Sequence, residues 1–293
     1  MLLLFSREVY IFYLMNNRSS FLFLLAIILL ASTNVFSQNR EVELPAEYSK
    51  YFKEYGVTGS LVIYDLNSDK FVYYDKERAH NRYSPASTFK IFNSLAGLET
   101  GVITDTSYVI QWDSVKRGKY APWHRPNSLN SAFKYSVVWY YQEVARRIGV
   151  EAMQRLISLN NYGNEDINEK VDEFWLSDMG GKLRISQVEQ VAFLRKLYKD
   201  ELAFSRRSQK LVKDIMLIEQ NDEYRLFAKT GMCSHDSLWF GWYVGWIEAG
   251  DNVYFFATHL ESENNMDILN GGRKGVTFAV LRDLGLITNK YQE

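Results

Sequence analysis

The chain has 293 residues, 47% of them hydrophobic and 24% charged, so it is long enough to bury one large core or two lobes that share a cleft. Its 34 lysine and arginine residues nearly balance its 35 aspartate and glutamate residues, which argues against nucleic acid or an anionic membrane surface as a partner. The single cysteine, Cys233, excludes an intramolecular disulfide, and the four scattered histidines lack metal-ligand spacing. We therefore expect a globular protein that binds a small molecule and uses no metal.

The N-terminal residues have the pattern of a secretory signal peptide. A basic segment around Arg18 precedes an apolar stretch from Phe21 to Ala31, and small residues continue to Ser37. The apolar stretch is shorter than the about 20 residues that span a bilayer. We expect residues 1–37, with Met15 as an alternative start, to be removed as a signal peptide, and the mature protein to be periplasmic or secreted without a stable membrane anchor. An uncleaved anchor is the alternative, because residues 9–15 are also apolar.

The first elements after this leader are predicted to be two strands and a helix. Residues 60–65 and 70–74 are rich in β-branched and aromatic side chains, and residues 66–69 form the turn of a hairpin. From Pro85 to Thr100, apolar side chains recur at spacings of three and four, which predicts a helix that begins beside Ser87.

The middle of the chain is mostly helical and its last third returns to strands. The helical period recurs in residues 135–148, 151–159, 186–199 and 208–218. Strand patterns follow in residues 224–230, 240–248 and 252–259, which we expect to form an antiparallel meander, and a final helix is predicted from about Gly272 to Leu284.

This order of elements indicates an α/β protein of the α+β type. We expect a single domain, residues 38–293, in which both ends of the chain build a central antiparallel sheet flanked by helices. Residues of about 103–220 would form a mostly helical lobe. A cleft between such lobes is the usual position of a ligand.

Two motifs carry nucleophilic chemistry. Ser87-Thr88-Phe89-Lys90 matches S-x-x-K, and residues three apart on a helix share a face, so Lys90 can act as a base toward the Ser87 hydroxyl. Ser131 to Lys134 matches the same string. Lys229-Thr230-Gly231 is predicted to end a strand, where the glycine lets a substrate lie along the edge. S-x-x-K on a helix followed by K-T-G on a strand is the arrangement of β-lactamases and penicillin-binding proteins.

A further serine is needed to pass a proton to the leaving nitrogen. Ser128-Leu129-Asn130 fits the Ser-x-Asn of class A β-lactamases and transpeptidases, whereas Ser136-Val137-Val138 fits the Ser-x-Val of class D. The strings alone do not decide between them.

The remaining motifs resemble those of the class D, or oxacillinase-type, serine β-lactamases over nearly all of the mature chain. They are Tyr162-Gly163-Asn164, Phe174-Trp175-Leu176 followed by Leu183-Arg184-Ile185-Ser186, and Arg273 before the last helix. Two features depart from that pattern. The loop Ser177–Gly181 is longer than the usual one, and Cys233 directly follows Met232 on the rim of the substrate site.

The resemblance implies a penicillin-hydrolysing enzyme of the penicillin-binding-protein transpeptidase-like fold that confers antibiotic resistance. Ser87 would be the nucleophile, and Lys90 the base after carboxylation by carbon dioxide or bicarbonate, with no other cofactor. Trp175 would hold the carbamate, Val138 and Leu176 would cover it, and Tyr162 and Asn164 would support the site. Ser136 would relay the proton, the amides of Ser87 and Met232 would form the oxyanion hole, and Lys229, Thr230, Gly231 and Arg273 would bind the substrate.

Two other functions share the nucleophile. A penicillin-binding transpeptidase or carboxypeptidase is expected to use Ser-x-Asn. A β-lactam sensor acylates without turnover and is expected to carry membrane helices and a metalloprotease domain ahead of this one, whereas a leader alone precedes it here. A structural or adhesive protein would leave the combination of motifs unexplained, so we expect an enzyme that is a monomer or homodimer.

Overall fold

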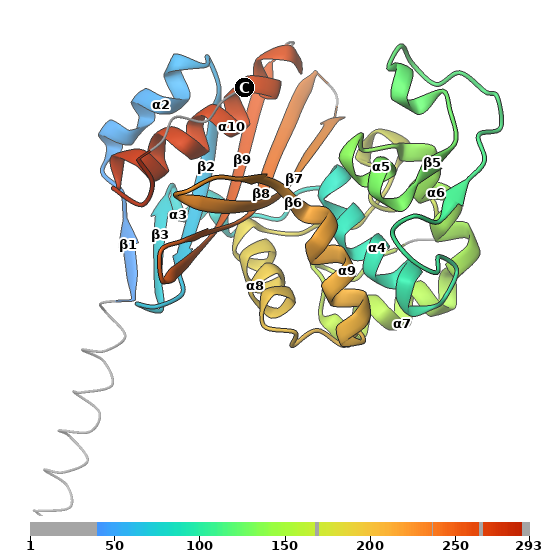
Figure 1. Ribbon diagram of the computed structural model, residues 1–293. Helices are drawn as coiled ribbons and strands as arrows, with labels where there is room; N and C mark the ends of the chain where they lie inside the picture. Colours follow the sequence, from blue (N-terminus) through green and yellow to red (C-terminus); the bar gives the residue numbers. More distant parts are fainter. Residues whose placement is uncertain (1–39, 168–169, 236, 264–265, 289–293) are drawn as a thin grey trace, which may run out of the picture. The chain divides into compact units, whose positions relative to one another are not determined.

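The computed structural model describes residues 40–167, 170–235, 237–263 and 266–288 (Figure 1). The chain divides into two units, Met1–Val42 and Glu43–Glu293. The predicted signal peptide, residues 1–37, lies outside the described residues. Strand β1 (Glu41–Glu43) spans the boundary, and every other described element belongs to the second unit.

An antiparallel sheet forms the centre of the second unit, with the strand order β3-β2-β9-β8-β7-β6. Its strands are β2 (Thr58–Asp65), β3 (Lys70–Tyr74), β6 (Leu217–Gln220), β7 (Tyr224–His235), β8 (Leu238–Ala249) and β9 (Asn252–Glu263). Because β2 pairs with β9 along its whole length, the N-terminal hairpin and the C-terminal meander share one sheet. The predicted fold class, hairpin and meander are therefore confirmed.

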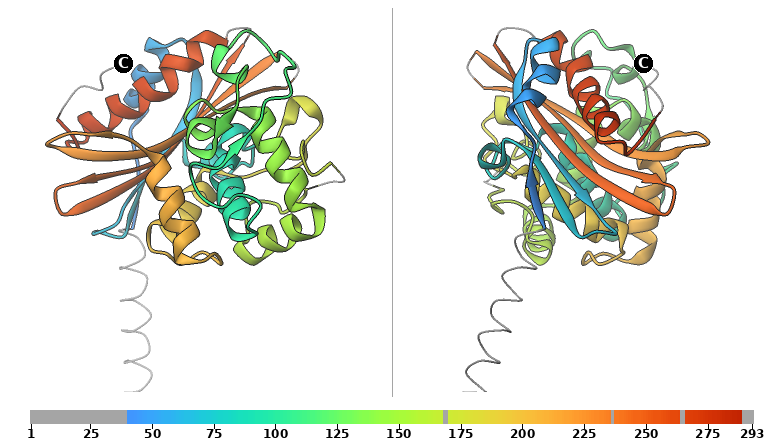
Figure 2. Two further views of the ribbon diagram at one scale, coloured as in Figure 1. Left: turned by 45° about the vertical axis from the view of Figure 1, so that its right-hand side comes forward. Right: turned by 90° about the vertical axis from the view of Figure 1, so that its left-hand side faces the viewer.

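One face of the sheet is covered by helices from the two ends of this unit (Figure 2). They are α2 (Ser49–Glu54), which follows the 3-10 turn η1 (Ala46–Tyr48), and α10 (Met266–Asp283). Leu61 and Phe256 of the sheet and Leu281 of α10 belong to the core between these layers and are fully buried. No helix among the described residues is long and apolar enough to cross a membrane.

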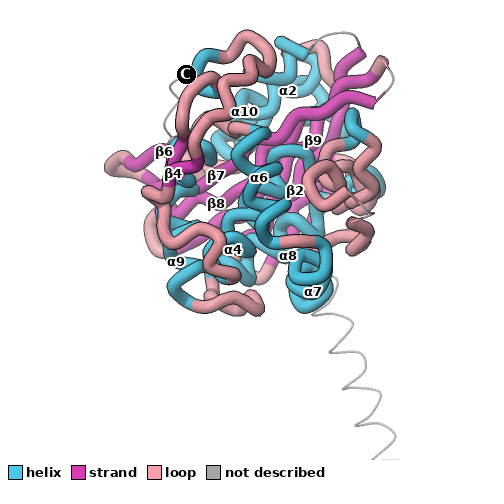
Figure 3. Tube along the Cα trace, turned by 90° about the vertical axis from the view of Figure 1, so that its right-hand side faces the viewer, coloured by secondary structure: helices cyan, strands magenta, loops and turns pink. Residues whose placement is uncertain are grey.

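The other face carries the helical lobe, which lies in front of the sheet in Figure 3. Its helices are α4 (Lys90–Glu99), α5 (Leu129–Lys134), α6 (Val138–Ile148), α7 (Val150–Asn160), α8 (Gln187–Tyr198) and α9 (Arg206–Met216). The shorter elements are α3 (Lys76–Ala79), the 3-10 turns η2 (Ala86–Phe89), η3 (Ala121–Trp123) and η4 (Ser177–Met179), and the two-stranded pair β4 (Val109–Ile110) and β5 (Asn127–Ser128).

Several predicted boundaries differ from the observed ones. The last helix begins at Met266 rather than near Gly272, so Arg273 lies within α10 and not before it. Gly272 acts here as a packing residue, since a Cβ atom there would lie 3.3 Å from the Tyr55 side chain. The predicted helix 135–148 begins only at Val138, because the positive φ of Ser136, 54°, cannot continue a helix.

Candidate active site

The predicted nucleophile lies on a tight turn rather than in an α-helix. Ser87 belongs to η2, and α4 begins only at Lys90, so the helix predicted for residues 85–100 opens with a 3-10 turn. Nζ of Lys90 donates a hydrogen bond to Oγ of Ser87 over 2.5 Å. The S-x-x-K spacing therefore brings the two side chains together as predicted.

Lys90 is completely buried, which is unusual for a lysine. Burial lowers the pKa of its ammonium group to about 7. The Tyr141 ring lies 5.6 Å from Nζ, and the Tyr141 hydroxyl bonds to Ser94. Near neutral pH a large part of the population therefore carries a neutral amine, which is the form that accepts a proton.

Trp175 packs against Phe89, the residue that precedes Lys90. Its indole stacks on Phe89 with ring centroids 5.3 Å apart, and Val138 and Leu176 contribute to the same core. The indole Nε1 is buried and has no hydrogen-bond partner among the described residues. A buried N–H without an acceptor costs about 1–3 kcal/mol, so this donor marks a place where an acceptor would be stabilised.

Ser136 and Lys229 meet from opposite sides of the site. Ser136 occupies the turn between α5 and α6, and Lys229 is in β7. Nζ of Lys229 donates to Oγ of Ser136 over 3.1 Å and to the main-chain oxygen of Thr230 over 3.0 Å. Burial holds the pKa of Lys229 well below its usual range, and the charges of Lys90 and Arg273 lower it further.

Lys229-Thr230-Gly231 lies in the middle of β7, which continues to His235, so the prediction that the motif ends a strand is wrong. The residues after it, 232–235, include no β-branched side chain, so the strand was not predicted to its full length. A Cβ atom on Gly231 would lie 3.1 Å from the main-chain oxygen of Pro85, so glycine is what lets β7 approach η2 and its serine. Met232 is the next residue along this strand.

Arg273 approaches the same strand from α10. Its Nη1 donates to the main-chain oxygen of Gly231 over 2.9 Å, and its Nη2 donates to Asn270 over 3.1 Å. Burial lowers the pKa of Arg273 to about 10, so it remains charged at neutral pH. The structure thus places a charged guanidinium beside Lys229.

The competing serines have local structural partners. Ser128 caps α5, and its side chain accepts from the amide of Ser131 over 3.2 Å. The Ser131 hydroxyl accepts from the amide of Ser128 and donates to Asn127. Of the candidate relay serines, Ser136 is the one that bonds to Lys229.

Tyr162-Gly163-Asn164 forms a structural clamp. The Asn164 side chain accepts from the amide of Arg184 and donates to the main-chain oxygen of Lys182. Gly163 has a φ of 61°, and a Cβ atom there would lie 2.1 Å from the Arg184 oxygen. This motif therefore holds residues 182–184, the end of the loop that carries Trp175, against the segment after α7.

The long loop after Leu176 is also fixed. Ser177 donates to the main-chain oxygen of Ser234 over 3.3 Å, so η4 is joined to the end of β7. Cys233 is buried there as a free cysteine, and burial raises the pKa of its thiol.

One residue of the site was not predicted from the sequence. Ser84 is buried, donates to the main-chain oxygen of Trp175 over 3.0 Å, and accepts from Nε1 of Trp242 over 2.8 Å. A single serine before Pro85 has no distinctive sequence signal, because its partners come from two distant segments.

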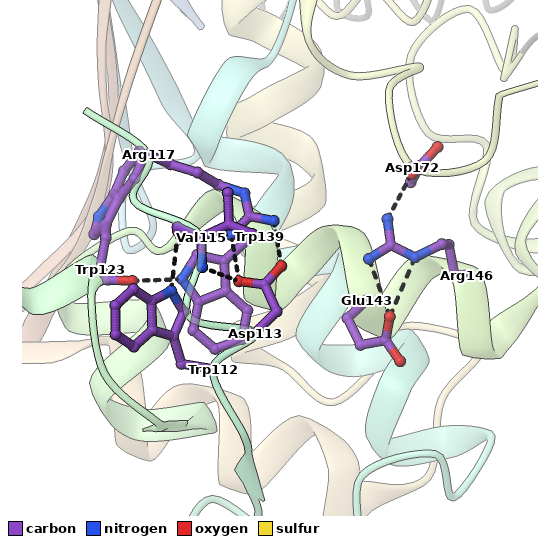
Figure 4. A network of polar contacts seen from close by, with 9 residues as sticks. All are labelled: Trp112, Asp113, Val115, Arg117, Trp123, Trp139, Glu143, Arg146 and Asp172. Carbon is purple, nitrogen blue, oxygen red and sulfur yellow. Dashed lines mark hydrogen bonds and ion pairs between the residues drawn. The ribbon is translucent and has the colours of Figure 1, made fainter.

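Two tryptophans of the loop between β4 and β5, Trp112 and Trp123, lie beside Trp139 of α6 (Figure 4). The indole of Trp139 donates to the main-chain oxygen of Trp123, and that of Trp112 donates to Val115. The indole of Trp123 in turn donates to the main-chain oxygen of Tyr135 over 3.0 Å. The loop is thus attached next to Ser136.

Across the described residues, no group of three or more histidine, cysteine, aspartate or glutamate side chains is arranged to hold a metal ion.

Comparisons with known proteins agree with this geometry. The family described as the penicillin-binding protein transpeptidase domain matches residues 26–279. Beta-lactamase OXA-48 of Klebsiella pneumoniae is 42% identical over 240 residues, which cover 82% of this chain and 88% of that protein. The crystal structure of the class D β-lactamase YbXI from Nostoc has a TM-score of 0.77 and 41% identity, covering 81% of this chain and 98% of that one.

A receptor shares the fold as well. The C-terminal domain of the Bacillus licheniformis BlaR penicillin-receptor has a TM-score of 0.78 at 30% identity, and covers 84% of this chain and 97% of that one. The enzymes have the higher sequence identity, and their similarity extends over most of both chains. On these grounds the chain belongs to the class D serine β-lactamases.

Proposed function

We propose that this protein hydrolyses the β-lactam ring of penicillin-type antibiotics through an acyl ester on Ser87, and so gives its host resistance to them. The observation that carries the proposal is the 2.5 Å hydrogen bond between Lys90 and Ser87, at a lysine whose pKa burial lowers to about 7. A neutral amine at this distance can take the hydroxyl proton as the oxygen attacks the ring carbonyl.

The residues around Lys90 fit a carbamate formed with carbon dioxide or bicarbonate. Only a neutral amine attacks carbon dioxide, and burial supplies that form. The unpartnered indole N–H of Trp175 would donate to the carbamate, and Val138 and Leu176 would shield it from water. The carbamate supplies a carboxylate-like base beside the Ser87 hydroxyl.

The other groups would act on the substrate carbonyl and nitrogen. The amides of Ser87 and Met232 would donate to the oxygen that becomes negative during attack. Ser136 would pass a proton to the leaving ring nitrogen, and its bond to Lys229 orients the hydroxyl for that step. A water would then attack the ester, activated by the base on Lys90.

Three groups would bind the substrate carboxylate. Lys229 and Arg273 are buried basic side chains, and Thr230 adds a hydroxyl on the same strand as Lys229. A bound carboxylate would favour the protonated form of Lys229. Charge-assisted hydrogen bonds of this kind are about twice as strong as neutral ones. Gly231 would leave room for the substrate, while Tyr162 and Asn164 would support the loop of Trp175.

The remaining parts of the proposal concern the whole protein. Residues 1–37 would be a signal peptide and residues 38–293 a single catalytic domain, exported to the periplasm or secreted. The apolar segment before Ala31 and the small residues up to Ser37 support it. We expect a monomer or a homodimer with no other partner than its substrate.

Replacement of Ser87 by alanine tests the assignment. Ser87→Ala should abolish hydrolysis of a penicillin, and mass spectrometry of the wild type quenched during turnover should find the penicilloyl adduct on the peptide that contains Ser87. An adduct on the Ser131 peptide instead would overturn the proposal. An adduct on Ser87 that persists without turnover would identify a sensor.

A further inference from the structure

The turn that carries the nucleophile contains a residue in an unusual conformation. Ala86, which directly precedes Ser87, has a φ of 48°, in the left-handed region that residues other than glycine rarely adopt. This conformation costs an alanine about 1–2 kcal/mol, because its Cβ atom comes close to the following carbonyl oxygen. Contacts around the turn therefore have to hold Ala86 in place.

Two consecutive hydrogen bonds close this turn. The Thr88 hydroxyl donates to the main-chain oxygen of Pro85 over 2.7 Å, and the Thr88 amide donates to the same oxygen over 3.1 Å. The Thr88 hydroxyl also accepts from Nε2 of Gln190 in α8 over 2.8 Å. Thr88 and Gln190 are both buried, so little water competes for these bonds. The conformation of residues 85–88 thus depends on a side chain 102 residues further along the chain.

The Thr88 side chain is held from a second direction by β7. A Cβ atom on Gly231 would lie 3.1 Å from Cγ2 of Thr88, so the methyl group faces the strand. Because a threonine side chain has few χ1 rotamers, this contact leaves the hydroxyl directed toward Pro85 and Gln190. The nucleophile turn is therefore held between β7 and α8.

We propose that Gln190 is a positioning residue, which holds Ala86 in its left-handed conformation through Thr88 and so directs the Ser87 amide toward the developing oxyanion. The inference rests on the proposed function, because that function places this amide in the oxyanion hole. Since the peptide bond is planar, the dihedral angles of Ala86 set the direction of the next N–H group, which belongs to Ser87. A return of Ala86 to the right-handed region would point this N–H group away from the substrate carbonyl.

Loss of this orientation should affect one step of the reaction. The oxyanion develops in the transition state, so a displaced donor slows acylation and leaves the affinity for the intact substrate nearly unchanged. A loss of stability alone would lower Tm without this division between rate and affinity.

Single-turnover kinetics of Gln190→Met with a penicillin measure the two quantities separately. Methionine keeps most of the length of the side chain and removes the N–H donor. We expect the acylation rate constant to fall about tenfold, while the Kd of the initial complex stays unchanged. Thr88→Val, which removes the accepting hydroxyl and keeps the shape, should cause a similar loss, and both substitutions together should cost little more than either one.

A boronic acid gives a second readout that does not depend on turnover. It adds to Oγ of Ser87, whose proton passes to the base, and forms an anionic tetrahedral adduct. Because one oxygen of the adduct takes the place of the oxyanion, Gln190→Met should bind the boronic acid about tenfold more weakly than the wild type.

Ala86→Gly tests the link through the backbone. Glycine adopts a positive φ without the steric cost, so Ala86→Gly introduced into the Gln190→Met protein should restore most of the acylation rate constant. This recovery is specific to a role in holding Ala86, because a glycine does not replace the hydrogen bond that Gln190 makes.

Gln187→Met is the matched control. Gln187 is a buried glutamine of the same helix, and it donates to the main-chain oxygens of Ser60 and Ala257 in the sheet. Its replacement should lower Tm but leave the acylation rate constant unchanged. An unchanged rate constant in Gln190→Met, an equal loss in Gln187→Met, or a loss that glycine at position 86 does not reduce would overturn the proposal. If the wild type formed no acyl ester on Ser87, the proposed function itself would fail, which is a different result.

Discussion

The hydroxyl of Ser84 donates a hydrogen bond to the main-chain oxygen of Trp175 over 3.0 Å, although 91 residues separate them. The main-chain oxygen of Ser84 accepts from the indole of Trp242 in β8 over 2.8 Å. Ser84 precedes the nucleophile turn by two residues, so it joins that turn to the sheet and to the segment that carries the unpartnered indole.

Ser84→Ala should therefore affect both stability and the environment of Lys90. An unsatisfied buried carbonyl costs about 1–3 kcal/mol, so we expect a Tm lower by about 2–12 °C. If Ser84 positions Trp175, the variant should also need more bicarbonate to reach half of its maximal activity. Thermal unfolding and bicarbonate titration measure the two effects.

Ser60→Ala is the matched control for this variant. Ser60 is a buried serine of β2 that bonds to the Gln187 side chain in α8. Its loss should lower Tm without changing the bicarbonate requirement. If the Ser84 variant needed no more bicarbonate than the wild type, Ser84 would have a structural role only.

His259 should make the stability of the fold depend on pH. It is fully buried in β9, with the Tyr83 and Trp242 rings 4.0 and 4.4 Å away, and neither ring nitrogen has a hydrogen-bond partner among the described residues. Burial, with a smaller contribution from Arg78, holds the pKa of His259 well below its usual value. The native state therefore keeps this imidazole neutral.

In the unfolded chain His259 has its ordinary pKa of about 6.5. As the pH falls below that value, the unfolded state takes up a proton that the native state does not, so the free energy of unfolding decreases. One proton corresponds to a slope of about 1.4 kcal/mol per pH unit. Urea unfolding of His259→Phe between pH 5 and 7 should lack this part of the slope, whereas His235→Gln, a change at an exposed histidine, should keep it. Equal slopes in both variants and the wild type would contradict the prediction.

The sequence predicted the elements whose side chains follow a simple period. Strands β2, β3, β8 and β9 have dense β-branched and aromatic residues, and α8 has a serine cap at Ser186, so these were placed nearly correctly. The end of β7 was missed because residues 232–235 are paired through their backbones, and their side chains carry little strand signal.

Contacts of the site between residues close together in the sequence could be predicted, whereas contacts between distant segments could not, because they depend on how the chain packs. Ser87 and Lys90 meet because they are three residues apart, and this geometry could be anticipated. The choice of Ser136 over Ser128 required the distance to Lys229, which is 93 residues away. The role of Ser84 could not be predicted, because it depends on two contacts with residues far away in the sequence and Ser84 belongs to no motif.

Trp175→Phe is the sharpest test of the mechanism, because it keeps most of the aromatic bulk and removes the buried N–H donor. If that donor holds a carbamate on Lys90, the carbamate should be lost more easily in the variant. Acylation should slow. Deacylation should slow more, because the attack by water depends more on the base than the attack by the positioned Ser87 hydroxyl does. The penicilloyl ester of Ser87 should therefore accumulate in the variant.

Added bicarbonate should restore part of this activity by mass action. Because burial lowers the pKa of Lys90 to about 7, protonation competes with carboxylation below neutral pH, so the effect should be largest under mildly acidic conditions. The measurements are turnover of a chromogenic cephalosporin with and without bicarbonate, for the wild type and Trp175→Phe, and a carbon-13 spectrum after labelled bicarbonate. The Ser60→Ala protein, in which the indole is retained, should respond to bicarbonate as the wild type does. Absence of a carbamate signal in the wild type, together with no bicarbonate response in the variant, would mean that Lys90 acts as a free amine.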